Sequence, residues 1–136
     1  MELILKGTPM GTPAVTILVA LVLFQLKHYV CDFVLQTQSQ LAAKGIYGAP
    51  GGLRHAGLHA IGSIPALYVL TRSPLVILAL IAFEFVLHYH VDYTKARVDA
   101  AHGWTVADLQ YWIVFGLDQF VHQLTYLGFV GVVELL

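Results

Sequence analysis

Residues 74–93 read PLVILALIAFEFVLHYHVDY, an apolar run that is interrupted by acids and histidines at a regular interval. The run is long enough to cross a membrane as a helix, because the bilayer core needs about 20 apolar residues. Glu84, His88 and Asp92 are four residues apart, so a helix places all three on one face. The pattern therefore predicts a helix with hydrocarbon on one side and polar partners on the other.

The composition of the whole chain agrees with this reading. Of the 136 residues, 58 % are hydrophobic and 11 % are charged, and the mean hydropathy is +0.75. Soluble domains carry about 25 % charged residues, and disordered chains have low hydrophobicity. Both classes are therefore excluded. The net charge of −1 gives no basic surface for nucleic acid, and the lone Cys31 excludes an internal disulfide framework. We expect one transmembrane domain over residues 1–136.

Four segments are apolar enough to be predicted as membrane spans: residues 13–36, 53–71, 74–93 and 108–133. The third begins with a recognisable signal, since Ser73 is a suitable N-cap and Pro74 fits the first helical position. The predicted fold is all-α: a polytopic membrane protein built as a bundle of four transmembrane helices with short interfacial segments.

Four spans place both termini on one side of the membrane. That side carries two basic residues, Lys6 and Arg72. The opposite side carries four: Lys44, Arg54, Lys95 and Arg97. The positive-inside rule makes the second side cytoplasmic, so both termini are predicted on the non-cytoplasmic side.

Each span carries histidines or acids three to four residues apart, and most of them fall at one depth. At 1.5 Å per residue, the candidates lie within roughly 15 Å of the cytoplasmic side, with His122 deeper than the others. Imidazole and carboxylate groups that converge in a dry bundle suit a divalent ion, zinc first, with manganese or iron as alternatives, and their number permits two ions. The predicted metal ligands are His28, Asp32, His59, His88, Asp92, Asp118 and His122.

Three residues are predicted to act in catalysis if the site is an enzyme. Asp118 and the deeper Glu84 could act as a base beside a metal-activated water. Lys95 lies one turn beyond Asp92 and could neutralise it or meet an anionic head group.

Other polar residues have simpler readings. His55 is expected at the interface and solvated, His90 is expected to point away from the His88 face, and His102 is expected in a loop. Cys31 is expected to pack as a small apolar residue. For the predicted ligands themselves, the alternative to metal binding is a set of interhelical hydrogen bonds that fix the packing.

Three motifs in this order resemble a known family. They are HxxxDFxLQ at His28–Gln36, HxxxDxxKxR at His88–Arg97 and DQxxH at Asp118–His122. The chain resembles, from about Leu18 to Leu127, a bacterial and phage membrane family named domain of unknown function 3307. It is also distantly similar to small membrane-bound metal-dependent hydrolases. The resemblance implies a bacterial inner-membrane protein and adds weight to an enzyme.

Three functions remain open at this point. The first is a metal-dependent hydrolase of a lipid-like substrate that works near the cytoplasmic interface. The second is an accessory subunit of a larger membrane complex, or a homo-oligomer, in which the histidines bind a tetrapyrrole or only support packing. The third is a carrier of divalent ions or protons. The non-cytoplasmic halves of the first and third spans are almost purely apolar, which argues against a path through a single chain.

Overall fold

A computed structural model describes residues 13–136, and every regular element in this range is helical. Lys6, part of the charge count above, lies outside the described residues. The elements are α1 (Pro13–Tyr29), the π-helix η1 (Val30–Val34), α2 (Gln38–Ala43), α3 (Pro50–Gly62), α4 (Ile64–Leu70), α5 (Pro74–His102) and α6 (Leu109–Leu135).

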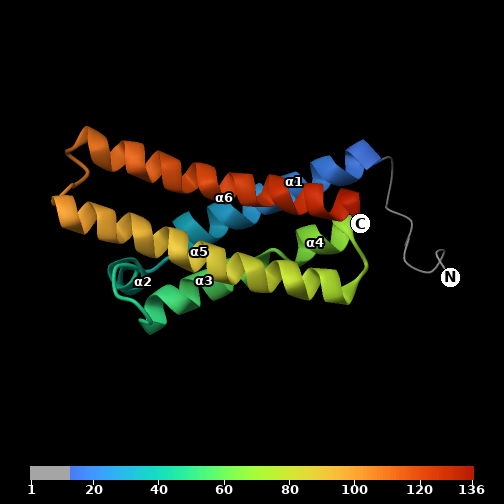
Figure 1. The fold of residues 1–136 in the computed structure, drawn as a ribbon, viewed down its shortest axis with the longest axis horizontal. Coiled ribbons are helices and arrows are strands. Elements are labelled where there is room, and N and C mark those ends of the chain that lie inside the picture. Colours follow the sequence, from blue (N-terminus) through green and yellow to red (C-terminus); the bar gives the residue numbers. More distant parts are fainter. Residues whose placement is uncertain (1–12) are drawn as a thin grey trace.

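The helices form an elongated bundle in which the chain direction alternates (Figure 1). α1 with η1 runs one way, α3 with α4 returns, α5 runs out again and α6 comes back. α3 packs on α5, α1 packs on α4, and α6 packs on α5 and α1. The short α2 and the α5–α6 connection lie at one end of the bundle, and the α4–α5 turn lies at the other.

The third predicted segment extends further in the structure than in the prediction, whereas the fourth has nearly the predicted bounds. Ser73 caps α5 by accepting a hydrogen bond from the Val76 N–H at 3.4 Å, and Pro74 is the first helical residue, as predicted. However, α5 continues past Tyr93 to His102, so His102 is helical and the expected loop at this position is wrong. The polar extension carries a Lys95–Asp99 ion pair one turn apart, and it ends at Gly103, whose φ of 67° stops the helix. α6 matches its expectation closely, as Leu109–Leu135.

The second predicted segment is two helices rather than one. α3 starts at Pro50, three residues before the expected start at Leu53, and it ends at Gly62. α4 begins immediately after Ser63 with Pro65 in its first turn. Proline has no N–H to continue the helical bonding pattern, so the chain breaks here.

The first predicted segment changes its helical type before it ends. The Leu35 N–H bonds to the Val30 carbonyl at 2.9 Å, five residues back, which is the π-helical pattern. After it, α2 is held by a capping box in which Thr37 and Gln40 bond each other's backbone N–H groups. α2 lies tightly against α3, because a Cβ on Gly51 would sit 2.7 Å from the Ala43 Cβ.

Polar and apolar side chains are distributed in the opposite way to a soluble protein. Leu18, Val22, Leu78 and Phe120 are among many large apolar side chains that are more than half exposed, whereas Glu84 is 2 % exposed. Six of the buried apolar side chains form a cluster in the half of the bundle near α4: Phe24, Ala66, Leu67, Leu80, Tyr126 and Phe129.

Two helical segments of the described chain are long and apolar enough to cross a membrane. They are Pro13–Val34, which joins α1 and η1, and Pro74–His102, which is α5. Only 22 % of the most apolar window of α5 is buried within the protein. These segments are therefore apolar toward the outside of the molecule rather than toward its core.

Candidate metal centre

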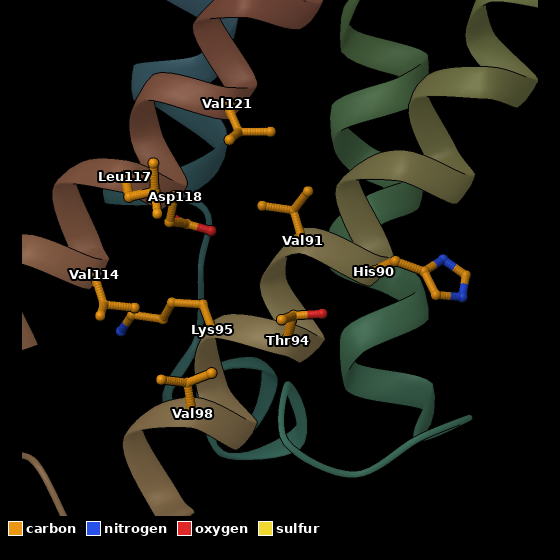
Figure 2. A pocket seen from close by; sticks show the side chains of 9 residues that line it. All are labelled: His90, Val91, Thr94, Lys95, Val98, Val114, Leu117, Asp118 and Val121. Atoms are coloured by element: carbon orange, nitrogen blue, oxygen red, sulfur yellow. The ribbon is translucent and has the colours of Figure 1, made fainter. Parts of the chain in front are cut away.

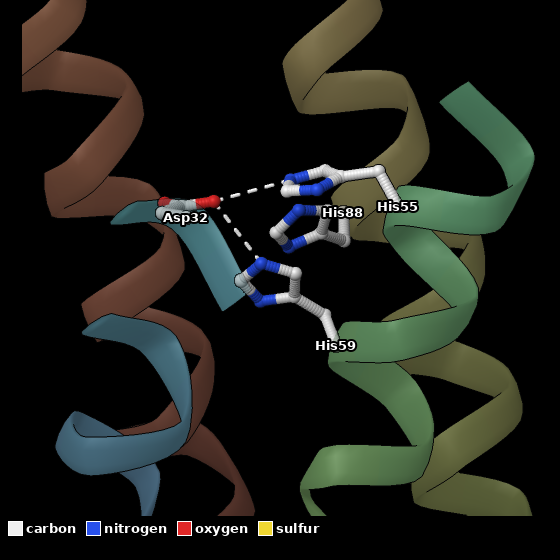
Figure 3. Close-up of side chains that lie close together, drawn as sticks. All are labelled: Asp32, His55, His59 and His88. Carbon is white, nitrogen blue, oxygen red and sulfur yellow. Dashed lines mark hydrogen bonds and ion pairs between the residues drawn. The ribbon is translucent and has the colours of Figure 1, made fainter. Parts of the chain in front are cut away.

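Four side chains from three elements meet at the centre of the bundle and form the first ligand group. Asp32 comes from η1, His55 and His59 from α3, and His88 from α5, and Figure 3 shows them facing one another. The Nε2 atoms of His55 and His59 each lie 3.1 Å from the Asp32 Oδ1. One ligating atom from each of the four residues lies within 4.8 Å of the others.

A second ligand group adjoins the first and shares His88 with it. It consists of His88, Asp92 and His122, and all three side chains are buried. The Asp92 Oδ2 is 3.3 Å from the His88 Nε2, and its Oδ1 is 3.6 Å from the His122 Nε2. The His55 Nε2 lies 3.4 Å from the Asp92 Oδ2, so the two groups are in contact.

Several ring nitrogens in these groups have no hydrogen-bond partner within residues 13–136. They are both nitrogens of His55, both nitrogens of His88 and the Nε2 of His122. A buried polar atom without a partner costs about 1–3 kcal/mol. The distances to the carboxylates are short, but the directions do not suit hydrogen bonds. Imidazole and carboxylate are the ligand types that zinc takes in proteins, so the residues present fit a bound divalent ion.

The local fold explains why these residues converge. His55 and His59 are one turn apart on α3, and His88 and Asp92 are one turn apart on α5, so each helix presents its pair on one face. α3 packs directly on α5. The rings of His59 and His88 stack at a centroid distance of 3.8 Å, and those of His88 and His122 at 4.1 Å.

His28 and Asp118 lie beside the ligand groups rather than in them. The His28 ring contacts the Tyr126 hydroxyl at 3.0 Å and the Gln119 Oε1 at 2.9 Å, and its Nε2 is 3.1 Å from the Asp32 Oδ2. Asp118 accepts a hydrogen bond from the Gln119 Nε2 at 3.2 Å, while its Oδ1 has no hydrogen-bond partner in the described chain. These residues are placed to orient the ligands around them.

A buried ion pair supports the cluster from the side of the apolar core. Lys27 of α1 is bonded to Glu84 of α5, and the two side chains are 8 % and 2 % exposed. The Lys27 Nζ also lies 3.3 Å from the His59 Nδ1. The residues predicted from the sequence include Glu84 but not Lys27. A lysine inside an apolar span indicates a buried interaction, because its charge needs a partner there.

The cationic neighbours of the cluster also differ from expectation. Lys44, which follows α2, pairs with the Asp92 Oδ2 at 2.9 Å. Lys95 pairs instead with Asp99 at 2.9 Å and lies 4.3 Å from the centre of the Tyr111 ring. Of the two roles expected for Lys95, neutralisation of Asp92 is therefore wrong, because Lys95 pairs with Asp99 and reaches toward α6, while Lys44 pairs with Asp92.

His55 is the clearest correction among the histidines. It was expected to be solvated, yet it is 0 % exposed and belongs to the first ligand group. His55 lies against Asp32 of η1 and against Asp92 and His88 of α5, so this residue is deeper than its sequence position suggests. His90 is exposed and bonds the Val86 carbonyl, which agrees with its expected direction. Cys31 is buried and free, also as expected.

A polar cavity of about 190 Å³ leads to the centre from the α2 end of the bundle. Asp32 and Asp92 line it on the side of the ligand groups, and Lys44, Lys95 and Asp118 line it elsewhere. Glu84 does not line it. The cavity gives a small polar molecule access to the carboxylates of both ligand groups.

Of the seven ligands predicted from the sequence, the structure brings five into the two groups: Asp32, His59, His88, Asp92 and His122.

Comparison with known proteins identifies the family of this chain. Neither the curated proteins nor the solved structures gave a match. The profile of the family described as "Protein of unknown function (DUF3307)" matches residues 19–133, so the chain belongs to this family.

Proposed function

We propose that this protein is an integral membrane protein that holds two divalent ions, zinc first, and uses them for hydrolysis. Its location in a bilayer is supported by the inverted distribution of side chains, with large apolar groups outside and charged groups inside. A charge that faces lipid costs about 2.5–3.5 kcal/mol on insertion scales, so these groups are stable only when they face one another. The alternating direction of the helices supports four spans, and the proposed location is the bacterial inner membrane that the family resemblance implies.

One observation carries the metal proposal. Ligating atoms from η1, α3, α5 and α6 converge, and many of the ring nitrogens among them have no hydrogen-bond partner in the described chain. Interhelical hydrogen bonds, the simpler reading, would leave those nitrogens paired. An ion in each ligand group would take one nitrogen from each ring that ligates it.

The two ligand groups divide naturally between two ions. If His88 serves the second group, the first ion has Asp32, His55 and His59, and the second has His88, Asp92 and His122. Each ion then has three protein ligands, and an open fourth position is typical of catalytic zinc. Paired ions are a common arrangement for hydrolysis.

The residues around the centre suit hydrolytic chemistry. A divalent ion lowers the pKa of bound water toward neutrality. The Asp118 Oδ1 lies 3.5 Å from the His122 Nε2, and Asp118 lines the access cavity, so Asp118 is placed beside the second ligand group to accept a proton. Lys27 forms an ion pair with Glu84 and also lies 3.3 Å from the His59 Nδ1, so Glu84 helps to position His59 through Lys27. Lys95 lines the cavity and is placed to bind substrate rather than to transfer a proton.

A carrier function is less well supported. The apolar cluster around Phe24, Leu80 and Phe129 fills the half of the bundle near α4. Ions that reach the centre from the α2 end would have to cross this apolar half to leave on the other side.

The experiment is metal-dependent hydrolysis by detergent-solubilised protein, with p-nitrophenyl phosphate and p-nitrophenyl butyrate as probes. We expect stripping with a chelator to abolish turnover and zinc or manganese to restore it. Asp118→Asn is expected to lose turnover while it keeps its metal, and Glu134→Gln, at an exposed acid, is expected to keep both. Full metal content without hydrolysis of any probe, together with purification as part of a larger complex, would favour the accessory subunit.

A further inference from the structure

An apolar groove runs between α5 and α6 on the outside of the bundle (Figure 2). Its volume is about 400 Å³, and its walls are formed by Val91 and Val98 of α5 and by Val114, Leu117 and Val121 of α6. This volume lies within the usual range for small-molecule sites.

The surface beside the groove is also apolar. Ile113 and Phe120, next to the groove residues along α6, are 60 % and 58 % exposed. In a membrane-embedded bundle the groove would therefore open sideways into hydrocarbon, from which an acyl or prenyl chain can enter without crossing water.

The groove adjoins the polar cavity of the metal centre. Lys95 and Asp118 line both of them. Figure 2 shows Asp118 between the two helices and Lys95 extending toward Val114. A single molecule with an apolar chain and a polar head can thus place the chain in the groove and the head beside Asp32 and Asp92.

The charge of the cavity favours an anionic head group. Lys44 and Lys95 each form one ion pair with an aspartate, and an ammonium group has three N–H donors, so each can still bind a phosphate oxygen. With two divalent ions bound, the positive charges exceed the three carboxylates that line the cavity. Binding of an anion should therefore depend on metal.

We infer that the substrate is a lipid phosphate, held by its chain between α5 and α6 and by its phosphate at the Lys44 and Lys95 end of the cavity. The inference rests on the proposed hydrolytic centre. In the reaction, a water oxygen bonds to phosphorus, the bond from phosphorus to the lipid oxygen breaks, and the lipid oxygen takes a proton. The products are a lipid alcohol and inorganic phosphate.

Binding tests the groove separately from catalysis. Dioleoyl phosphatidate is titrated into zinc-loaded protein in detergent and followed by native mass spectrometry, with dioleoylglycerol as the uncharged comparison. We expect phosphatidate to bind more tightly than dioleoylglycerol, and to lose that advantage when the metal is removed. Val114→Trp fills the groove and should weaken phosphatidate binding about tenfold or more, as expected when an apolar pocket loses its fit.

Matched variants separate these effects from general damage. Ile113→Trp makes the same kind of change one residue away on the exposed face and should bind normally. Lys95→Gln should weaken phosphatidate but not dioleoylglycerol, and Arg97→Gln, outside both cavities, should change neither. Val121→Phe is the second groove variant if Val114→Trp does not fold, as judged by its metal content.

The outcomes distinguish the inference from the function beneath it. Equal phosphatidate binding by wild type and both groove variants would overturn the inference. Hydrolysis of p-nitrophenyl phosphate as fast as phosphatidate, with no effect of Val114→Trp, would also overturn it but leave the hydrolytic centre intact. Metal-loaded protein that hydrolyses neither compound would contradict the proposed function, and the titration would still decide the groove.

Discussion

His88 is the residue on which the two ligand groups depend, since it belongs to both. Its ring lies between those of His59 and His122, and neither of its nitrogens has a hydrogen-bond partner within residues 13–136. In the proposed two-ion centre, a residue in this position would contribute to metal affinity whichever ion it serves.

We therefore predict that His88→Ala loses at least one of the two ions, because no other side chain can replace a ligand so deeply buried. The measurement is metal content by inductively coupled plasma mass spectrometry. His90→Ala removes an exposed histidine two residues away on the same helix and should retain both ions. Equal metal content in the two variants would remove His88 from the site.

The Lys27–Glu84 pair gives a prediction about stability. Lys27→Met leaves Glu84 as an uncompensated buried charge, which should reduce the free energy of unfolding by about 3–5 kcal/mol. The double variant Lys27→Met/Glu84→Leu should recover most of this loss, because it removes both charges. The measurement is a denaturation titration in mixed detergent micelles. A double variant no more stable than the single one would show that the pair is not the source of the effect.

Candidate site residues could be identified from the sequence where their spacing along one helix marked them. Residues whose surroundings depend on distant segments could not. Asp92, at four residues from His88, could be assigned to a shared helix face from the sequence alone. The burial of His55 depends on its contacts with η1 and α5, and the partner of Lys27 lies on another helix. Neither contact follows from the periodicity of one segment.

Among the helices, the contact between α2 and α3 fixes the position of Lys44 over Asp92. At Gly51 an added Cβ would meet the Ala43 Cβ at 2.7 Å and the Ser39 carbonyl oxygen at 3.1 Å. The backbone oxygen cannot move aside as a flexible side chain would.

Gly51→Ala is therefore expected to destabilise the protein by about 1–3 kcal/mol, the usual cost of overpacking. Gly116→Ala is the matched control, because nothing lies within 4 Å of its added Cβ. It should be neutral or stabilise α6 by up to about 1 kcal/mol, since alanine favours helix over glycine. The same denaturation titration decides, and equal effects at both glycines would contradict the close packing.

Helix starts were more predictable than helix ends and irregularities. Ser73 and Pro74 mark the start of α5, because an N-cap hydroxyl and a proline at the first helical position both favour a helix start, and the structure agrees. The π-helix at Val30–Val34 has no comparable signal, because neither glycine nor proline marks it. The end of α5 was placed at the last apolar residue, whereas the helix continues to Gly103, where the backbone turns left-handed.

For the whole molecule, the distribution of charge along the bundle predicts its orientation. Lys44, Arg54 and Lys95 belong to the end that holds α2 and the start of α3, and Arg72 belongs to the opposite end. Under the positive-inside rule we predict that the first end is cytoplasmic.

Thiol labelling tests this orientation. Ala107→Cys, in the α5–α6 connection, should resist a membrane-impermeant maleimide in spheroplasts and react after permeabilisation. Leu136→Cys should react without permeabilisation, since α6 ends on the other side. Native Cys31 is buried and provides the unlabelled background. The reverse labelling pattern would invert the orientation, and labelling of both variants in intact spheroplasts would contradict an odd number of spans between them.

The all-helical fold class was predictable from the sequence, because apolar segments long enough to span a membrane leave few alternatives to helices. The sequence predicted that histidines from separate segments lie at a similar depth in the bundle, but not which of them are in contact. Which of them touch depends on helix rotation, which the break at Ser63 and the π-helix both alter. The expected set included His28 and Asp118, which lie beside the ligand groups, and it omitted His55, whose depth in the bundle was underestimated.

The decisive measurement for the metal centre is the metal content of wild-type protein purified in detergent without chelators. We expect about two divalent ions per chain, as in a two-metal centre. Protein that is folded but carries no stoichiometric metal, and takes up none from added zinc, manganese or iron, would contradict it.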